Sequence, residues 1–207
     1  LTITASCIEA KRLGQVRQPW IVVPNHLLGQ WAVEARDAYP NANILVAAEL
    51  DGRDDRQRFV GQSAVGDWDL VIVPQSVFGK IAMRREAQID YLESELAELR
   101  QALDAANTQG AEFTVKQIEN AIKAAEGRIE KLIDAKATDD GLTFEQSGCD
   151  FLFVDEAHDY KNLTRPSNSA DLSVPTGSQR ATDLEMKAKY LREQARARGV
   201  EQGMAHA

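Results

Sequence analysis

Two adjacent carboxylates follow an apolar run in the last third of the sequence. The run Phe-Leu-Phe-Val (residues 151–154) leads directly into Asp155 and Glu156, and His158 follows two residues later. A buried strand that ends in a carboxylate can present it to a magnesium ion on nucleotide phosphates, because this hard ion takes oxygen ligands. Asp155 is then the metal ligand, and Glu156 orients and deprotonates the water that attacks the terminal phosphate. The spacing predicts nucleotide hydrolysis, with His158 sensing the nucleotide rather than touching the metal.

Two other interpretations compete with this one. In the first, the two acids lie in a solvated loop at the end of a strand and have no chemical role. In the second, Asp155, Glu156 and His158 ligate a metal directly, as in a metal-dependent hydrolase. The second is disfavoured because His158 lies only three residues from Asp155 in a turn after a strand, and the sequence holds no second ligand cluster.

Four short apolar runs, rich in β-branched and aromatic residues, alternate with segments of helical periodicity. The runs cover residues 20–23, 43–47, 69–73 and 151–154. Such runs are typical of a parallel sheet that is buried on both faces, and their alternation with helices predicts an α/β fold. Ligands gather at the carboxyl ends of the strands in such sheets. The turns after the first, third and fourth runs are therefore the expected positions of a site.

A different pattern separates the third run from the fourth. Apolar residues over 89–106, and again over 115–132, recur at alternating steps of three and four, and Asn107-Thr108-Gln109-Gly110 interrupt them. This heptad spacing predicts two helices that fold back on each other as an antiparallel helical hairpin.

The hairpin is expected to be an insertion within the sheet-containing domain. Residues 1–80 and 141–200 are expected to form the sheet-containing domain, residues 81–140 the inserted hairpin, and residues 201–207 a disordered tail. The insertion holds 8 basic and 13 acidic residues. This acidic balance favours a stabilising appendage or a contact with a protein partner over a contact with DNA.

Charge and cysteine content exclude several classes of protein. The 207 residues hold 24 basic and 32 acidic side chains, a net charge of −8, which argues against a simple basic nucleic-acid-binding module. Residues 180–198, with six basic and three acidic side chains, are interpreted as a solvated helix, with a nucleic-acid contact as the alternative. No apolar run approaches the roughly 20 residues that span a bilayer, so no membrane contact is expected. Cys7 and Cys149 are too few for a disulfide framework or a zinc site, and the cytoplasm is the expected location.

Several segments resemble one family. The string DEAHDYKNL (155–163) resembles motif II of superfamily 2 helicases and translocases, and its Lys-Asn pair is typical of the Swi/Snf-like branch. PWIVVPNHLLGQWAVEA (19–35) is similar to motif Ia, and DWDLVIVPQSVF (67–78) is similar to motif Ib, with Pro-Gln in place of a Thr-Tyr pair. TGSQRATDLEMKAKYLRE (176–193) resembles a segment of phage, plasmid and mobile-element proteins that join such a helicase to a DNA methyltransferase.

This resemblance implies a RecA-like lobe of an ATP-dependent DNA helicase or translocase, with ATP and Mg²⁺ at Asp155 and Glu156. It also implies a second RecA-like lobe as a partner. In this family the turns of motifs Ia and Ib contact the DNA backbone, and polar side chains at helix starts suit phosphates. The alternative is that Asn25 and Ser76 only cap helices. The residues carried over as DNA contacts are Pro24, Asn25, His26, Gln75, Ser76 and Lys161.

Two departures from the family pattern shape the expectation for this chain. The sequence contains no glycine-rich phosphate-binding loop, and its opening LTITASCIEA resembles the helix that follows such a loop. By this resemblance, the sequence is also expected to stop before motif III and to lack the second RecA-like domain, which would supply an arginine finger. The chain is therefore expected to be an N-terminal lobe fragment that turns over negligible ATP alone. The alternative function is a non-catalytic interaction module, in which a degenerate lobe displays the hairpin as a docking arm.

Overall fold

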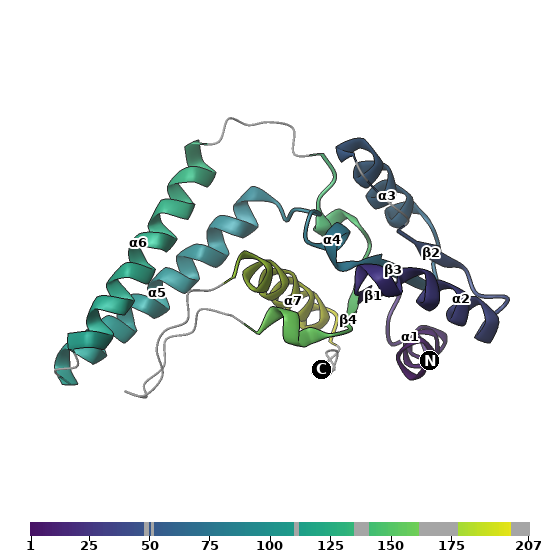
Figure 1. Ribbon diagram of the computed structural model, residues 1–207, viewed down its shortest axis with the longest axis horizontal. Helices are drawn as coiled ribbons and strands as arrows, with labels where there is room; N and C mark the ends of the chain where they lie inside the picture. The colour runs from purple at the N-terminus through teal and green to yellow at the C-terminus, as the bar shows by residue number, and fades with distance from the viewer. Residues whose placement is uncertain (48–49, 51, 110–111, 135–140, 162–177, 200–207) are drawn as a thin grey trace. The chain divides into compact units, whose positions relative to one another are not determined.

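The computed structural model describes residues 1–47, 50, 52–109, 112–134, 141–161 and 178–199 (Figure 1). The expected tail at 201–207 lies outside these residues. The chain divides into two compact units, each described separately below. The first unit comprises Leu1–Met83, Asp140–His158 and Lys187–Ala207, and the second comprises Arg84–Asp139 and Asp159–Met186.

The first unit is built on a four-stranded sheet. Its strands are β1 (Pro19–Val23), β2 (Ile44–Val46), β3 (Leu70–Pro74) and β4 (Phe151–Val154). They are hydrogen-bonded in the order β2-β3-β1-β4, and all three neighbouring pairs are parallel. Each strand coincides with one of the four apolar runs. The predicted α/β fold with a parallel sheet in a RecA-like arrangement is confirmed.

Helices connect the strands, as the alternation of patterns predicts. Gly14, in the left-handed conformation (φ 70°), follows the first helix, where a residue without a Cβ has no steric penalty. The helices outside the hairpin are α1 (Thr2–Arg12), the 3₁₀ helix η1 (Asn25–Leu27), α2 (Leu28–Ala38), α3 (Arg53–Val65), α4 (Gln75–Phe78), the 3₁₀ helices η2 (Phe144–Gln146) and η3 (Ala157–Tyr160), and α7 (Gln179–Ala197).

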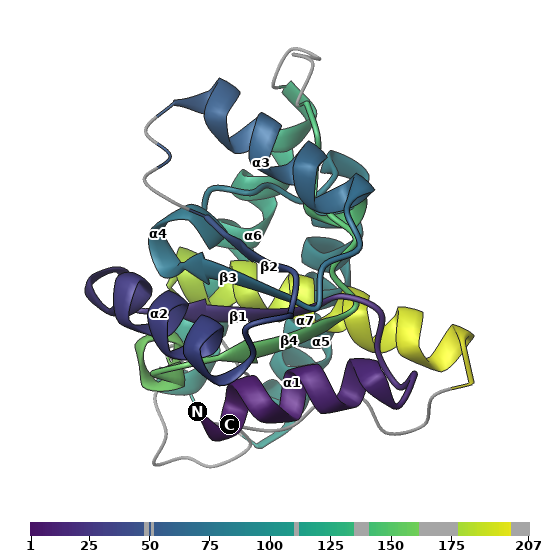
Figure 2. The ribbon, with the colours of Figure 1, turned by 90° about the vertical axis from the view of Figure 1, so that its right-hand side faces the viewer.

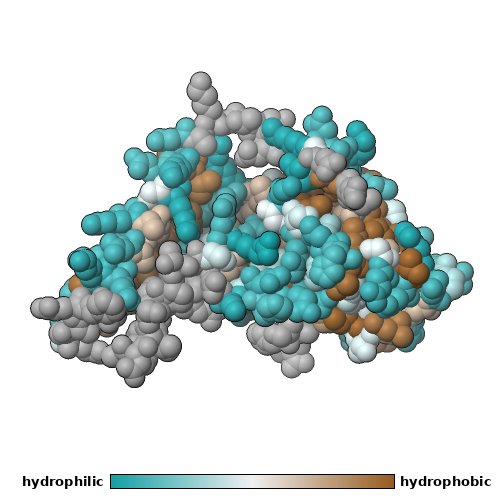
Figure 3. All heavy atoms as spheres, viewed as in Figure 1, coloured by the Kyte–Doolittle hydropathy of each residue, from teal (hydrophilic) through white to brown (hydrophobic). Residues whose placement is uncertain are grey.

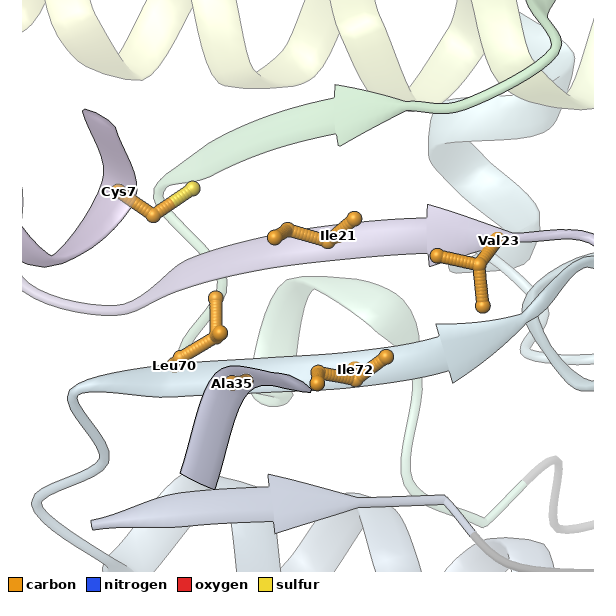
Figure 4. Close-up of a cluster of buried hydrophobic side chains, with 6 residues drawn as sticks. All are labelled: Cys7, Ile21, Val23, Ala35, Leu70 and Ile72. Carbon is orange, nitrogen blue, oxygen red and sulfur yellow. The ribbon is translucent and has the colours of Figure 1, made fainter. Parts of the chain in front are cut away.

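One face of the sheet packs against α1 and α2. Ile21 and Val23 of β1 and Leu70 of β3 are fully buried there, against Cys7 of α1 and Ala35 of α2 (Figure 4). Alternate residues of a strand point to opposite faces, so the other residues of β1 and β3 serve the second face. This apolar cluster holds the two central strands, β1 and β3, against α1 and α2.

The opposite face is covered by α3, η2 and the C-terminal part of α7. Trp20 of β1 meets Phe59 of α3 and Phe144 of η2 in edge-to-face contacts, with ring centroids 5.8 and 6.0 Å apart. Phe144 also contacts Tyr190 of α7, at 6.3 Å. Figure 2 shows α1 and α3 on opposite sides of the strands. Edge-to-face aromatic pairs add to the stabilisation from buried area.

The two edge strands are less buried than the sequence predicts. Every residue of β1 and β3 is buried, whereas β2 and β4 each bury only their second residue fully. The predicted burial on both faces holds for the two central strands, whereas the edge strands are only partly buried. The physical reason is position: within the described residues, β4 is hydrogen-bonded only to β1, and β2 only to β3.

The second unit contains the predicted hairpin. Helices α5 (Arg85–Gln109) and α6 (Glu112–Asp134) pack against each other around Leu99, Ala106 and Ile118. An ion pair between Arg100 and Glu126, with N and O atoms 3.0 Å apart, lies on the outside. Hydrophilic side chains cover most of the hairpin surface visible in Figure 3. Among the described residues, no helix has the length and apolar character that crossing a membrane requires.

Candidate functional site

Three turns meet at the carboxyl edge of the sheet. The register places Val23 of β1 beside Pro74 of β3, and Val22 beside Val154 of β4. The amide of Asp155 extends the ladder by donating to Val22 O at 2.8 Å. The chain leaves all three strands at this edge. The turns predicted from the sequence to carry the site are therefore brought together, although they lie about 50 and 80 residues apart.

Asp155 lies at the tip of β4 with its side chain partly exposed. Its Oδ1 accepts a hydrogen bond from the amide of Glu156, at 3.1 Å. This bond holds the carboxylate against its own turn. A half-buried carboxylate held at the end of a parallel strand has the placement that a single magnesium ligand needs.

Glu156 has an unusual backbone conformation. Its φ is 56°, the only positive φ of a residue other than glycine in the described part of the chain. This left-handed conformation costs a residue with a Cβ roughly 1–2 kcal/mol. The Glu156 side chain is 51% exposed. A carboxylate that is reachable by solvent can accept a proton from water.

His158 pairs with Glu156. Its Nδ1 lies 2.9 Å from Oε2 of Glu156, and the imidazole is 67% exposed. The sequence predicts that His158 does not touch the metal, and this contact gives it a different neighbour, the candidate base. Among the described residues, no three or more His, Cys, Asp or Glu side chains are grouped so that they could hold a metal ion. The direct three-ligand arrangement considered from the sequence therefore has no support among those residues.

The turn after β1 exposes two of its three predicted contact residues. Asn25 and His26 are exposed, whereas Pro24 is buried. Asn25 does not cap its own helix, which has Pro24 at its N-cap and no side-chain capping bond. Instead, its Oδ1 accepts a hydrogen bond from the amide of Ser76, at 3.1 Å. Asn25 is therefore not an N-cap, and it instead accepts from an amide in the first turn of α4.

The turn after β3 divides its polar residues between the surface and the interior. Ser76 is exposed, but Gln75 is only 8% exposed. The Nε2 of Gln75 points inward and donates to the carbonyl oxygen of Asp155 at 3.4 Å, near the long limit of a hydrogen bond. Ser76 is the second residue of α4, whose N-cap is Pro74, so Ser76 is not a cap. Only one of the two predicted polar contacts in this turn faces solvent.

A lysine that sequence reasoning missed supports this turn. Lys187 of α7 is completely buried, and its ammonium group donates to the carbonyl oxygen of Phe78, the last residue of α4, at 2.8 Å. The sequence interpretation counted it with the solvated basic side chains of residues 180–198. Nothing in a single sequence distinguishes it from its neighbour Lys189, because its partners come from distant segments.

The remaining predicted residue lies in the second unit. Lys161 is exposed. Tyr160 before it is buried, and its hydroxyl has no hydrogen-bond partner among the described residues. Burial raises the pKa of Tyr160 to about 12. This phenol therefore remains protonated at neutral pH and anchors the chain ahead of Lys161 as an apolar side chain would.

Neither cysteine has the properties of a nucleophile. Cys7 and Cys149 are both buried and unpaired. Burial raises the pKa of the Cys7 thiol to about 12, and it raises that of Cys149 well above its usual value. Since the thiolate is the reactive form, both groups are inert in the folded protein at neutral pH.

Comparison with known proteins identifies a family. Neither the curated proteins nor the solved structures contain a match to the chain. A family model described as a probable helicase domain matches residues 1–200. The match covers the sheet, the hairpin and α7 alike, so the insertion lies within the matched region. The chain therefore belongs to the family of probable helicase domains.

Proposed function

We propose that the chain is part of the N-terminal RecA-like lobe of an ATP-dependent DNA helicase or translocase of the Swi/Snf-like type. The observation that carries the proposal is the position of Asp155 and Glu156 at the carboxyl end of a strand in a parallel sheet. Ligands of such sheets bind at this edge. Membership of the helicase-domain family supports the same conclusion.

In the proposed reaction each acid has its own task. Asp155 would supply one carboxylate to Mg²⁺, and the bound ion would neutralise charge on the nucleotide phosphates. Glu156 lies beside it and faces solvent, where it orients the attacking water and accepts its proton. The 207 residues contain no glycine-rich phosphate-binding loop. We therefore assign ATP turnover to the full-length protein and not to this segment alone.

DNA contacts are proposed for exposed residues of the turns after β1 and β3 and, independently, for Lys161 of the second unit. Asn25, His26 and Ser76 face solvent after β1 and β3, and Lys161 is exposed in the second unit. Amide, hydroxyl and cationic groups donate to phosphate oxygens, so the contacts are independent of base sequence and weaken as salt rises. Pro24 and Gln75, which are buried, shape the two turns from within.

The test compares two Glu→Gln variants of the full-length protein in the presence of DNA. Removing a general base costs about 10²–10⁴ in rate, so Glu156→Gln should lower kcat by at least about 100-fold while ATP still binds. Glu34→Gln is the matched control, because Glu34 lies exposed on α2 and should retain the wild-type rate. Hydrolysis by Glu156→Gln at the wild-type rate would show that the role given to Glu156 is wrong.

A further inference from the structure

Helix α4 is a single turn whose position depends on other segments. Isolated helices of this length are unstable, because one turn fixes several residues for very few hydrogen bonds. Asn25 accepts from the Ser76 amide at its start, and Lys187 donates to Phe78 O at its end, at 3.1 and 2.8 Å. Contacts from η1, in the turn after β1, and from α7 thus hold both ends of α4.

The first residue of α4 reaches the candidate catalytic turn. Gln75 is 8% exposed, and its Nε2 donates to the carbonyl oxygen of Asp155, at 3.4 Å. That oxygen belongs to the peptide group that joins Asp155 to Glu156. The amide side of the same peptide group donates to Asp155 Oδ1, at 3.1 Å. Both polar atoms of this peptide group are therefore engaged, directly before the left-handed Glu156.

We propose that Gln75 is a positioning residue that links the DNA-facing turn at Ser76 to the peptide group between Asp155 and Glu156. Ser76 is exposed and adjacent to Gln75 in one helical turn, so a phosphate bound at Ser76 moves the Gln75 carboxamide with it. The Gln75 carboxamide in turn fixes the orientation of the peptide plane before Glu156, and with it the direction of the Glu156 side chain. Gln75 contacts no reacting atom and acts only through this peptide group. The functional part of this inference rests on the proposed helicase function, whereas the positioning itself does not.

The chain offers a matched pair of variants. Gln75→Met removes the amide donor and keeps side-chain length. Gln18→Met makes the same change at a buried glutamine (6% exposed) just ahead of β1, where Gln18 donates to Ser63 Oγ and Ser147 O at 2.7 and 3.0 Å. The control lies at the amino end of the strands, away from Asp155. A general loss of stability is therefore expected in both variants, and a loss of positioning only in Gln75→Met.

The first measurement is amide hydrogen exchange of the 207-residue chain, without ATP or DNA. Gln75→Met should speed exchange of the Glu156 amide by about fivefold, the change that loss of one hydrogen bond produces. Gln18→Met should leave this amide at the wild-type rate and speed exchange around Ser147 instead. Equal rates at Glu156 in wild type and Gln75→Met, or equal acceleration in both variants, would overturn the proposal.

The second measurement concerns coupling in the full-length protein. The ratio of kcat with a 30-base-pair duplex to kcat without it should fall about fivefold in Gln75→Met, while the Kd for the duplex changes less than about twofold, because the side chain is buried. Gln18→Met should keep the wild-type ratio. An unchanged ratio in Gln75→Met would overturn the coupling. If wild-type protein shows no DNA-stimulated hydrolysis, the proposed function fails, and the exchange measurement still decides whether Gln75 positions the turn.

Discussion

The ammonium group of Lys187 is enclosed between the rings of Phe78 and Phe144 and bonded to the carbonyl oxygen of Phe78. Its Nζ lies 4.2 Å from the Phe78 ring centroid, 5.5 Å from that of Phe144 and 2.8 Å from the oxygen. A buried cation is costly unless such partners compensate for lost hydration. The Lys187 ammonium group bonds a carbonyl at the end of α4 and packs against the rings of Phe78 and Phe144.

Lys187→Ala is expected to destabilise the protein strongly. The substitution leaves a cavity and removes the shorter of two hydrogen bonds to the Phe78 carbonyl, which keeps its bond from the Ile81 amide at 3.3 Å, so the free energy of unfolding should fall by about 3 kcal/mol. Urea unfolding followed by circular dichroism measures the change. Lys189→Ala is the control in the same helix, where Lys189 is only partly buried, and should cost less than about 1 kcal/mol. Equal losses in the two variants would contradict the account of the buried ammonium.

His158 is expected to affect turnover more than ATP binding. Its Nδ1 holds the Glu156 carboxylate at 2.9 Å, so His158→Ala should release the candidate base and lower kcat about tenfold, the equivalent of one charge-assisted hydrogen bond. His158→Asn keeps a donor near the Nδ1 position and should recover part of the rate. Steady-state kinetics of the full-length protein decides between these outcomes. If His158→Ala retains the wild-type kcat, then His158 does not orient the Glu156 carboxylate.

Stability should fall in alkaline solution in a way that depends on Cys7. Burial raises the pKa of Cys7 from 9.0 to about 12, so above pH 9 the unfolded chain releases this proton while the folded chain retains it. The free energy of unfolding therefore decreases between about pH 9 and pH 12, by at most about 1.4 kcal/mol per pH unit from this thiol, and is unaffected below pH 8. Urea unfolding at pH 7, 9 and 10 should show a smaller alkaline slope in Cys7→Ala than in wild type. Identical slopes would exclude the contribution.

The hairpin is expected to be dispensable for the sheet. Within the described part of the chain, the apolar cluster of Leu99, Ala106 and Ile118 packs against other residues of α5 and α6. Replacing residues 84–137 with a short Gly/Ser linker should therefore lower helix content but leave a cooperative unfolding transition. Thermal and urea unfolding by circular dichroism provide the measurement. A gradual transition without cooperativity would mean that the hairpin belongs to the core of the first unit.

The sequence predicts elements better than it predicts contacts. The four apolar runs and the two heptad segments locate β1 to β4 and both long helices, because burial on a sheet or in a hairpin leaves a periodic trace. The same logic places the turns at Asn25, Ser76 and Asp155 on one edge, since parallel strands end together. The exposure of the edge strands could not be predicted, because apolar content does not reveal which strand has a neighbour on both sides.

The polar contacts within the site could not be predicted for a different reason. Asn25 and Ser76 are 51 positions apart and Gln75 and Asp155 are 80 apart, and no local pattern pairs such residues. Glutamine and lysine are usually exposed, so Gln75 and Lys187 were expected at the surface. Each is buried because a backbone carbonyl from a distant segment accepts its hydrogen bond, a circumstance that only the tertiary structure provides.

The left-handed backbone at Glu156 creates a conflict between stability and activity at one position. Asparagine and glycine adopt this conformation more readily than glutamate does, so either should make the fold easier to maintain there. A laboratory selection for heat resistance alone would be expected to enrich such replacements and to discard the outward-facing carboxylate with them. A second selection would require both heat resistance and activity. If it retains the glutamate, then position 156 keeps a strained backbone because its carboxylate is needed for activity.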